Sequence, residues 1–141
     1  MTLTEDDLDT LVSIAIRRAE ILDELGSSAA RDAWNEVMLY EEQLATITPP
    51  EEIPGGIARV GAVAAALSAG QRLDAERLAS KYLAETLLPA ERREAIARAF
   101  QDDREFLARR FPALSRIGRL TELDEWRSDN SRNPCVFPRA V

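Results

Sequence analysis

The chain has 141 residues, a formal net charge of −7 at pH 7 and no histidine. This length fits one domain with a sizeable core that needs no disulfide or metal, and the acidity argues against nucleic acid as the main partner, because phosphate contacts dominate that affinity. The lack of histidine removes the commonest general base, the histidine-activated nucleophiles and most zinc sites.

The composition is rich in alanine, leucine, glutamate and arginine, which favours an all-α fold. Near the N-terminus, Thr4 and Asp7 resemble a capping box, in which each residue bonds the backbone N–H of the other. Apolar residues then recur with the i, i+3, i+4, i+7 spacing of one helix face. This pattern predicts a first helix over residues 4–25, with Gly26 as its stop.

A second helix is predicted to end near Ile47, and either Ser27 or Ser28 can supply its N-terminal cap. Because only a few residues separate the two helices, they must form an antiparallel hairpin. Residues 48–56 contain three prolines and two glycines, so we expect a stiff connector that no helix crosses.

The stretch 57–69 is apolar and made mainly of small residues, with Arg59 as its one charge. A helix that is hydrophobic all round is buried in a core or spans a membrane, and this one is too short to span. We therefore expect it to be the central buried helix of the domain. Gly70 ends it.

Two further helices follow the central one. In the first, a stripe of leucine, alanine and tyrosine predicts a core-facing side (Leu73, Ala75, Leu78, Ala79, Tyr82, Leu83 and Leu87). Pro89 suits the first turn of the second, which is predicted over residues 90–111 and has Asp103 interrupting its apolar face. A buried acid needs a basic partner, and Arg59 or Arg104 are candidates.

The C-terminal part is less regular. A short helix is predicted to end at Trp126, and residues 128–141 are predicted to form a tail that contains Cys135, the only cysteine. The expected organisation is one all-α domain over residues 1–127, with five main helices in antiparallel hairpins around 57–69. A lone cysteine and no secretory signal favour a cytoplasmic location, with no membrane association.

The segment Gly70-Gln71-Arg72-Leu73-Asp74-Ala75, with Pro89 closing the following helix, resembles the turn and second helix of a tetratricopeptide-type repeat. The resemblance covers residues 8–89 at most. It departs from the repeat at Ala79, where a bulky aromatic is usual, and it implies TPR-like helical hairpins.

Charge divides the chain into two parts: residues 1–56 hold 13 acidic and three basic side chains, whereas residues 57–141 hold 12 acidic and 15 basic ones. Such an acidic half would attract a basic protein surface. Trp is favoured in binding hot spots, which makes Trp126 a candidate anchor for a partner. Trp34, in contrast, is expected to be an anchor of the core. The candidate partner-binding residues are therefore Glu36, Glu41, Glu42, Trp126 and Phe137.

These features favour a non-catalytic interaction or adaptor domain that binds another protein through a helical groove or its acidic face. We expect no catalytic residue, cofactor or metal. One alternative is a small immunity- or antitoxin-type protein that neutralises a basic partner. Another is a helical-bundle enzyme or metal binder that uses carboxylates such as Glu41 and Asp103. Leftover apolar surface also permits a homodimer.

Overall fold

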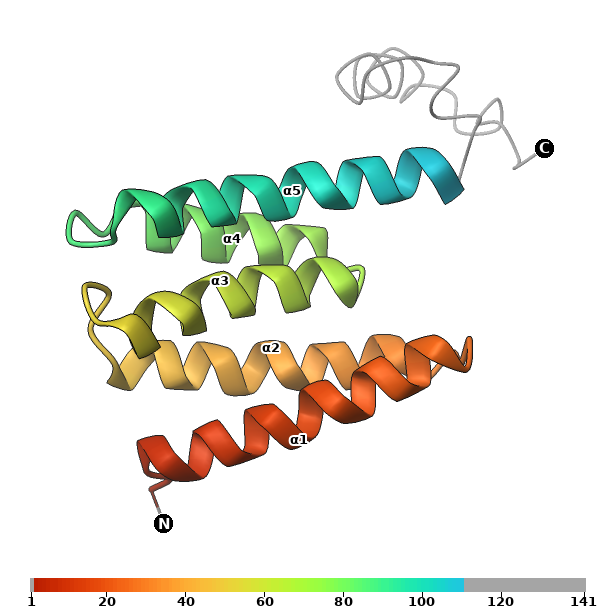
Figure 1. Ribbon diagram of the computed structural model, residues 1–141, viewed down its shortest axis with the longest axis horizontal. Helices are drawn as coiled ribbons and strands as arrows, with labels where there is room; N and C mark the ends of the chain where they lie inside the picture. The colour runs from red at the N-terminus through yellow and green to blue at the C-terminus, as the bar shows by residue number, and fades with distance from the viewer. Residues whose placement is uncertain (1, 111–141) are drawn as a thin grey trace, which may run out of the picture. The chain divides into compact units, whose positions relative to one another are not determined.

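The computed structural model describes residues 2–110, which form five α-helices and no strand (Figure 1). The predicted all-α class is confirmed. The helices are α1 (Glu5–Glu24), α2 (Ala30–Ile47), α3 (Ile53–Ser68), α4 (Arg72–Leu83) and α5 (Ala90–Arg110).

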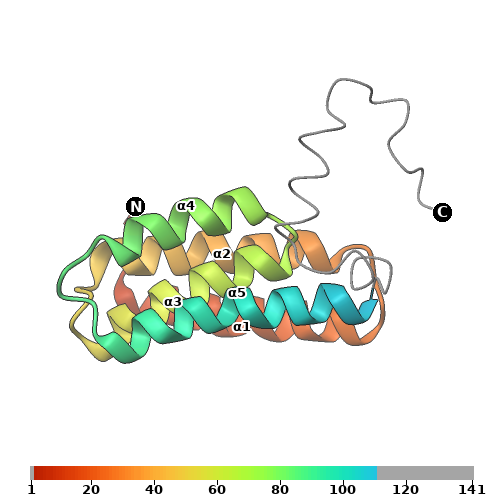
Figure 2. The same cartoon turned by 90° about the horizontal axis from the view of Figure 1, so that it is seen from above.

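The helices lie in two layers, with α1, α3 and the first part of α5 on one side and α2 and α4 on the other (Figure 2). Helix α2 packs most extensively against α1 and α3, and α3 also packs on α4. The core lies between the layers and consists mainly of alanine and branched aliphatic residues. Its largest fully buried side chains are Tyr82, Leu78, Ile96, Val37 and Val63.

The start of α1 has the predicted capping box. The Asp7 N–H donates to Thr4 Oγ1 at 3.2 Å, and the Thr4 N–H donates to Asp7 Oδ2 at 3.1 Å. Gly26 turns the chain after α1 with a φ of 65°. The predicted serine cap of α2 is wrong, because its N-cap is Ala29 and no side chain bonds there. Ser27 Oγ instead accepts the Ala29 N–H within the turn.

The connector before α3 is shorter than predicted. Helix α3 begins at Ile53, so its first turn contains Pro54 and two glycines of the expected loop. A proline costs little there, because N–H groups in a first turn have no intrahelical acceptor. Gly55 is required for packing: a Cβ at this position would lie 1.8 Å from the carbonyl oxygen of Pro49.

Helix α3 occupies the centre of the fold, and most of its residues are buried. The prediction of a central buried helix therefore holds for most of α3, but one face of the helix is not fully covered. Ile57 and Ser68 are exposed, and the residues between them on the same face are only partly covered. One face of α3 is therefore open.

In α4 the core-facing residues are Ala75, Leu78, Ala79 and Tyr82. Leu73 was predicted on the same side but is 83% exposed, and Leu83 and Leu87 are exposed as well. Leu73 precedes Ala75 by two residues, which places it about 200° away around the helix. Leu87 lies beyond the end of α4 at Leu83.

Residues 1–101 form one compact unit, and the chain from Asp102 onward belongs to a second one. The predicted boundary at residue 127 lies outside the described residues, as do Trp126, Cys135 and Phe137. Among residues 2–110, no helix combines the length and the apolar character that crossing a membrane requires.

We expect Gly55→Ala to destabilise the protein by about 3 kcal/mol or more, because the added methyl group overlaps a backbone carbonyl that cannot move aside. Gly26→Ala is the control. An added Cβ there meets no atom within 4 Å, so only the positive φ opposes it, at about 1 kcal/mol. Urea unfolding of both variants measures the difference. Equal losses would contradict the proposed close contact between Gly55 and Pro49.

Candidate interaction surface

The open face of α3 carries no charge. Its members recur three or four residues apart, which is the spacing of one helix face. Ile53 is 70% exposed and Ile57 is 50% exposed, and the residues that continue the face are partly buried or exposed. We call this face the α3 strip, and it consists of Ile53, Ile57, Val60, Gly61, Ala64 and Ser68.

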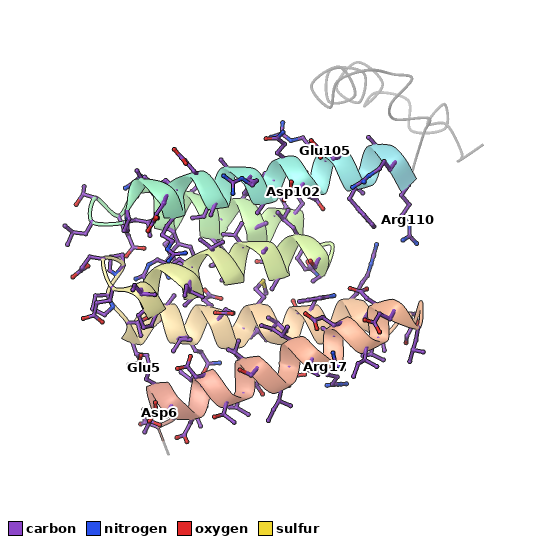
Figure 3. The ribbon with its side chains drawn as sticks, viewed as in Figure 1. Glu5, Asp6, Arg17, Asp102, Glu105 and Arg110 are labelled. Atoms are coloured by element: carbon purple, nitrogen blue, oxygen red, sulfur yellow. The ribbon has the colours of Figure 1, made fainter. Side chains whose placement is uncertain are left out.

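Two helices of the same layer lie on either side of the α3 strip (Figures 1 and 2). On the α5 side, the aliphatic stem of Arg92 lies beside Gly56, where a Cβ would come within 3.0 Å of Arg92 Cγ. Helix α1 on the other side is strongly acidic, and Figure 3 shows Glu5 and Asp6 near its start. The exposed acids of α1 are Glu5, Asp6, Asp7, Asp9, Glu20, Asp23 and Glu24.

A buried carboxylate lies at the junction of α1, α2 and α3. Glu41 of α2 is only 5% exposed. A Cβ at Gly61 of the α3 strip would lie 2.6 Å from Glu41 Oε1, so the carboxylate sits directly against this glycine. Burial, with a contribution from the negative charge of Asp9 on α1, raises the pKa of Glu41 to about 7.

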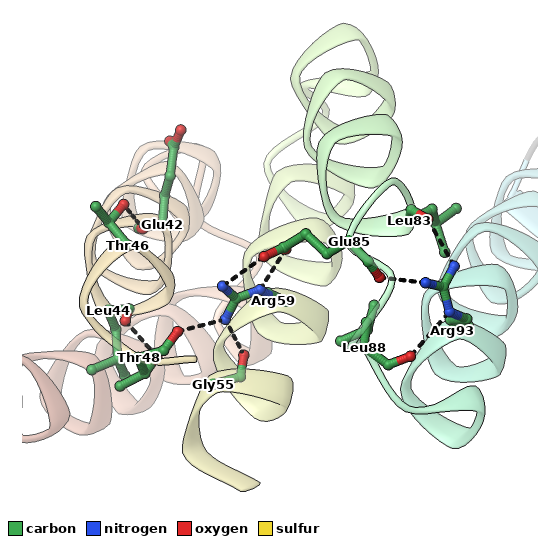
Figure 4. Close-up of polar contacts among 10 residues, drawn as sticks. All are labelled: Glu42, Leu44, Thr46, Thr48, Gly55, Arg59, Leu83, Glu85, Leu88 and Arg93. Atoms are coloured by element: carbon green, nitrogen blue, oxygen red, sulfur yellow. Dashed lines mark hydrogen bonds and ion pairs between the residues drawn. The ribbon is translucent and has the colours of Figure 1, made fainter. Parts of the chain in front are cut away.

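The opposite face of α3 is held by Arg59, which is also 5% exposed (Figure 4). Its Nε and Nη2 donate to the two carboxylate oxygens of Glu85, at 2.6 and 3.0 Å. Its Nη1 donates to the carbonyls of Thr48 and Gly55 at 3.0 and 2.9 Å. One guanidinium thus joins the connector before α3, the first turn of α3 and the loop after α4.

Tyr82 of α4 packs against this cluster, with the Arg59 guanidinium 5.5 Å from the centre of its ring. Its hydroxyl is buried and makes no hydrogen bond to the described residues. Burial raises the pKa of Tyr82 to about 12. The phenol is therefore neutral, and it acts as an apolar support beneath the Arg59 side chain.

A second arginine fixes the loop between α4 and α5. Arg93 donates to the carbonyls of Leu83 at 2.7 Å, Leu88 at 3.0 Å and Glu85 (Figure 4). These bonds satisfy acceptors at the C-terminal end of α4 and in the loop, where helical partners are lacking. The loop that presents the Glu85 carboxylate to Arg59 is therefore itself held in place.

The predicted site residues are not brought together. Glu36 is partly exposed and pairs with Arg18 of α1 at 3.0 Å, while Glu42 pairs with Arg77 of α4 at 3.2 Å. Glu41 does not lie beside them on the surface, because it points into the helix junction.

One other side chain has different surroundings from those that the sequence suggested. Arg59, a candidate partner for Asp103, pairs with Glu85. Asp103 itself lies in the second unit and is half-buried. Trp34 is partly buried against the core, and its indole N–H donates to Asp23 at 2.5 Å.

Sequence reasoning missed the α3 strip and the burial of Glu41, although both leave a trace in the sequence. Positions 53, 57, 60, 64 and 68 form a helical face without a charge inside a chain in which charged residues make up 30%. Glu41 is four residues after Val37 and three before Leu44, both buried, so it occupies a core-facing position of α2.

The described residues offer little to a metal ion, since none of them form a group of three or more potential ligands. A hollow of about 360 Å³ lies between the start of α1 and the end of α2, and its lining bears no charge: Thr2, Leu3, Leu8, Gln43, Thr46 and Ile47. The arrangement of α3, Glu41 and α1 is suited to contact with apolar and basic groups.

Comparisons with known proteins do not assign the chain to a family. No family model matches the chain, and neither curated proteins nor solved structures gave a significant match.

We expect Glu85→Ala to lower the free energy of unfolding by about 3 kcal/mol, because it leaves the Arg59 guanidinium buried without its counter-charge. Glu42→Ala is the matched control. It also removes a carboxylate from an arginine pair, but Arg77 is half-exposed and water replaces the lost partner, so the cost is below about 1 kcal/mol. Chemical unfolding at pH 7 compares them. A loss of similar size in both variants would mean that the burial of Arg59 does not set the strength of the interaction.

Glu41→Gln should change how stability depends on pH. Since burial raises the native pKa of Glu41 from 4.5 to about 7, the native state binds a proton that the unfolded chain has already released between these values. The wild type therefore loses stability as pH rises through this window, on the order of 3 kcal/mol in total. Glutamine carries no charge, so the variant lacks this loss.

The measurement is the free energy of unfolding of both proteins between pH 4.5 and 8.5. The difference between them should grow with pH and become constant above about pH 8. Glu42→Gln is the control and should follow the wild-type profile. A pH-independent difference between wild type and Glu41→Gln would show that Glu41 titrates normally.

Proposed function

We propose that the protein is a non-catalytic interaction module that binds an apolar segment of another protein, bordered by basic residues, across the α3 strip. The observation that carries this proposal is the open, uncharged face of the central helix, next to the acidic helix α1. The proposed role is that of an adaptor in the cytoplasm.

The partner segment is expected to be apolar because the α3 strip leaves apolar surface in contact with water. Ile53 and Ile57 leave large aliphatic surfaces in water at the centre of a helical layer. Covering apolar surface gains roughly 25 cal/mol per Å², and contiguous exposed apolar patches commonly mark protein interaction sites. Stacked helical hairpins often bind partners on the open face of one layer, which fits the resemblance to tetratricopeptide-type repeats.

The partner is expected to be positively charged because α1 is acidic. Seven exposed acids, Glu5, Asp6, Asp7, Asp9, Glu20, Asp23 and Glu24, lie on this helix, whose exposed basic residues are Arg17 and Arg18. A partner with basic residues around its apolar segment would be steered toward this side, and salt would slow the association. An immunity- or antitoxin-type protein would use the same complementarity against a basic toxin.

Self-association is a second candidate, and a separate feature favours it. Ile14, Ile21 and Leu25 are exposed and spaced seven and four residues apart on the face of α1 that carries no buried residue. This stripe would pair with the same stripe of a second copy. Light scattering across a range of concentrations distinguishes a dimer from a monomer.

The test of the proposed module compares Ile57→Glu with Leu73→Glu. Both replace an exposed aliphatic residue with an acid, but only Ile57 belongs to the α3 strip. Immobilised wild type and both variants are incubated with lysate of the source cell at low salt, and bound proteins are identified by mass spectrometry.

A stoichiometric partner should bind both wild type and Leu73→Glu. The amount bound to Ile57→Glu should be at least tenfold lower, and 0.5 M salt should weaken the complex. Circular dichroism and thermal melts verify that both variants are folded. A partner that binds Ile57→Glu as well as wild type would place the interface elsewhere, and turnover of a small molecule by the pure protein would argue for an enzyme.

A further inference from the structure

The edge of the α3 strip borders a carboxylate that has no counter-charge among residues 2–110. Gly61 belongs to the strip and is itself partly exposed. Its missing side chain leaves the space into which Glu41 Oε1 reaches, at 2.6 Å from the position of a Cβ. Asp9 of α1 is close enough to influence the Glu41 carboxyl electrostatically. Apolar surface and two acids therefore adjoin one another at this junction.

Glu41 is unusual among the acids of the described residues. It is 95% buried, yet within residues 2–110 its carboxylate has no hydrogen-bond donor and no ion-pair partner. Buried charges are normally paired, because leaving water costs several kcal/mol. Among residues 2–110, Tyr82 Oη is the only fully buried side-chain oxygen or nitrogen that lacks a hydrogen-bond partner. The Glu41 oxygens also lack a partner but are not in this group, so they retain some contact with solvent.

A single organic cation would suit this carboxylate better than a metal ion. A divalent metal ion takes about six oxygen ligands, and the described residues contain no group of even three ligating side chains. A lysine or arginine side chain needs only one or two carboxylates. Its aliphatic stem can also lie along an apolar surface while its head reaches an acid, which matches a carboxylate at the edge of the α3 strip.

We propose that Glu41, assisted by Asp9, receives one lysine or arginine side chain of the bound partner between α1 and α3, while neighbouring apolar side chains of that partner cover the α3 strip. This inference rests on the proposed function and specifies its recognition element. The basic side chain would be the anchor of the partner segment, because it enters the most buried position of the surface.

Protonation of Glu41 then competes with the partner. Because the pKa of Glu41 is about 7, the carboxylate is mostly protonated at pH 6 and mostly charged at pH 8. A cation prefers the charged form, so the basic anchor should bind about tenfold more tightly at pH 8 than at pH 6. This direction is opposite to the pH dependence that a histidine in the partner would impose.

The experiment selects a displayed library of amphipathic 20-residue helices against the immobilised full-length protein. Selected peptides whose binding is lost in Ile57→Glu are synthesised in two forms, one with the basic residue and one with norleucine, which keeps the alkyl chain of lysine without its charge. Fluorescence anisotropy measures both peptides at pH 6 and pH 8. The proteins compared are wild type, Glu41→Gln, Asp9→Asn and the control Glu42→Gln.

We expect wild type and Glu42→Gln to prefer the lysine peptide at least tenfold at pH 8, Glu41→Gln to lose the preference, and Asp9→Asn to reduce it. Equal binding of the lysine and norleucine peptides to wild type would overturn this inference but leave the proposed function standing. Failure to select any peptide that depends on Ile57 would overturn both.

Discussion

The ion pair between Arg59 and Glu85 is the interaction on which the arrangement of this fold depends. It fixes the rotation of α3 about its own axis, because the only charge of that helix is tied on one side to a carboxylate and two backbone carbonyls. With Arg59 turned inward, the opposite side of α3 is left without charge. The internal ion pair and the uncharged outer face are therefore two results of one orientation.

Three glycines also determine how α3 packs, because another group approaches the backbone of α3 at each of them. Gly55 lies against a carbonyl, Gly56 against the stem of Arg92, and Gly61 against the Glu41 carboxylate. Each contact brings a different segment of the chain onto α3. A helix that is weak by intrinsic propensity is thus held by its neighbours, because tertiary packing replaces what the residues lack in helix preference.

Much of the secondary structure could be predicted from periodicity and caps. The boundaries of α1 and the end of α2 followed from Thr4, Gly26 and the prolines, which act locally. The start of α3 could not, since Gly55 and Pro54 read as breakers until the tertiary contact with Pro49 is known. The site was harder to predict. Glu41 resembled its neighbour Glu42 as a surface acid, and only the packing of three helices separates them.

The three carbonyls that Arg93 holds belong to the end of α4 and to the loop after it, whereas Arg93 itself belongs to α5. Rotation of the start of α5 relative to α4 would break all three bonds together. The end of α4 and the start of α5 should consequently move together as one rigid body. Arg92 precedes Arg93 in the chain and lies against Gly56 of α3. A displacement of Arg92 would therefore be transmitted to the loop that carries Glu85, and from there to the core, because no flexible hinge absorbs it.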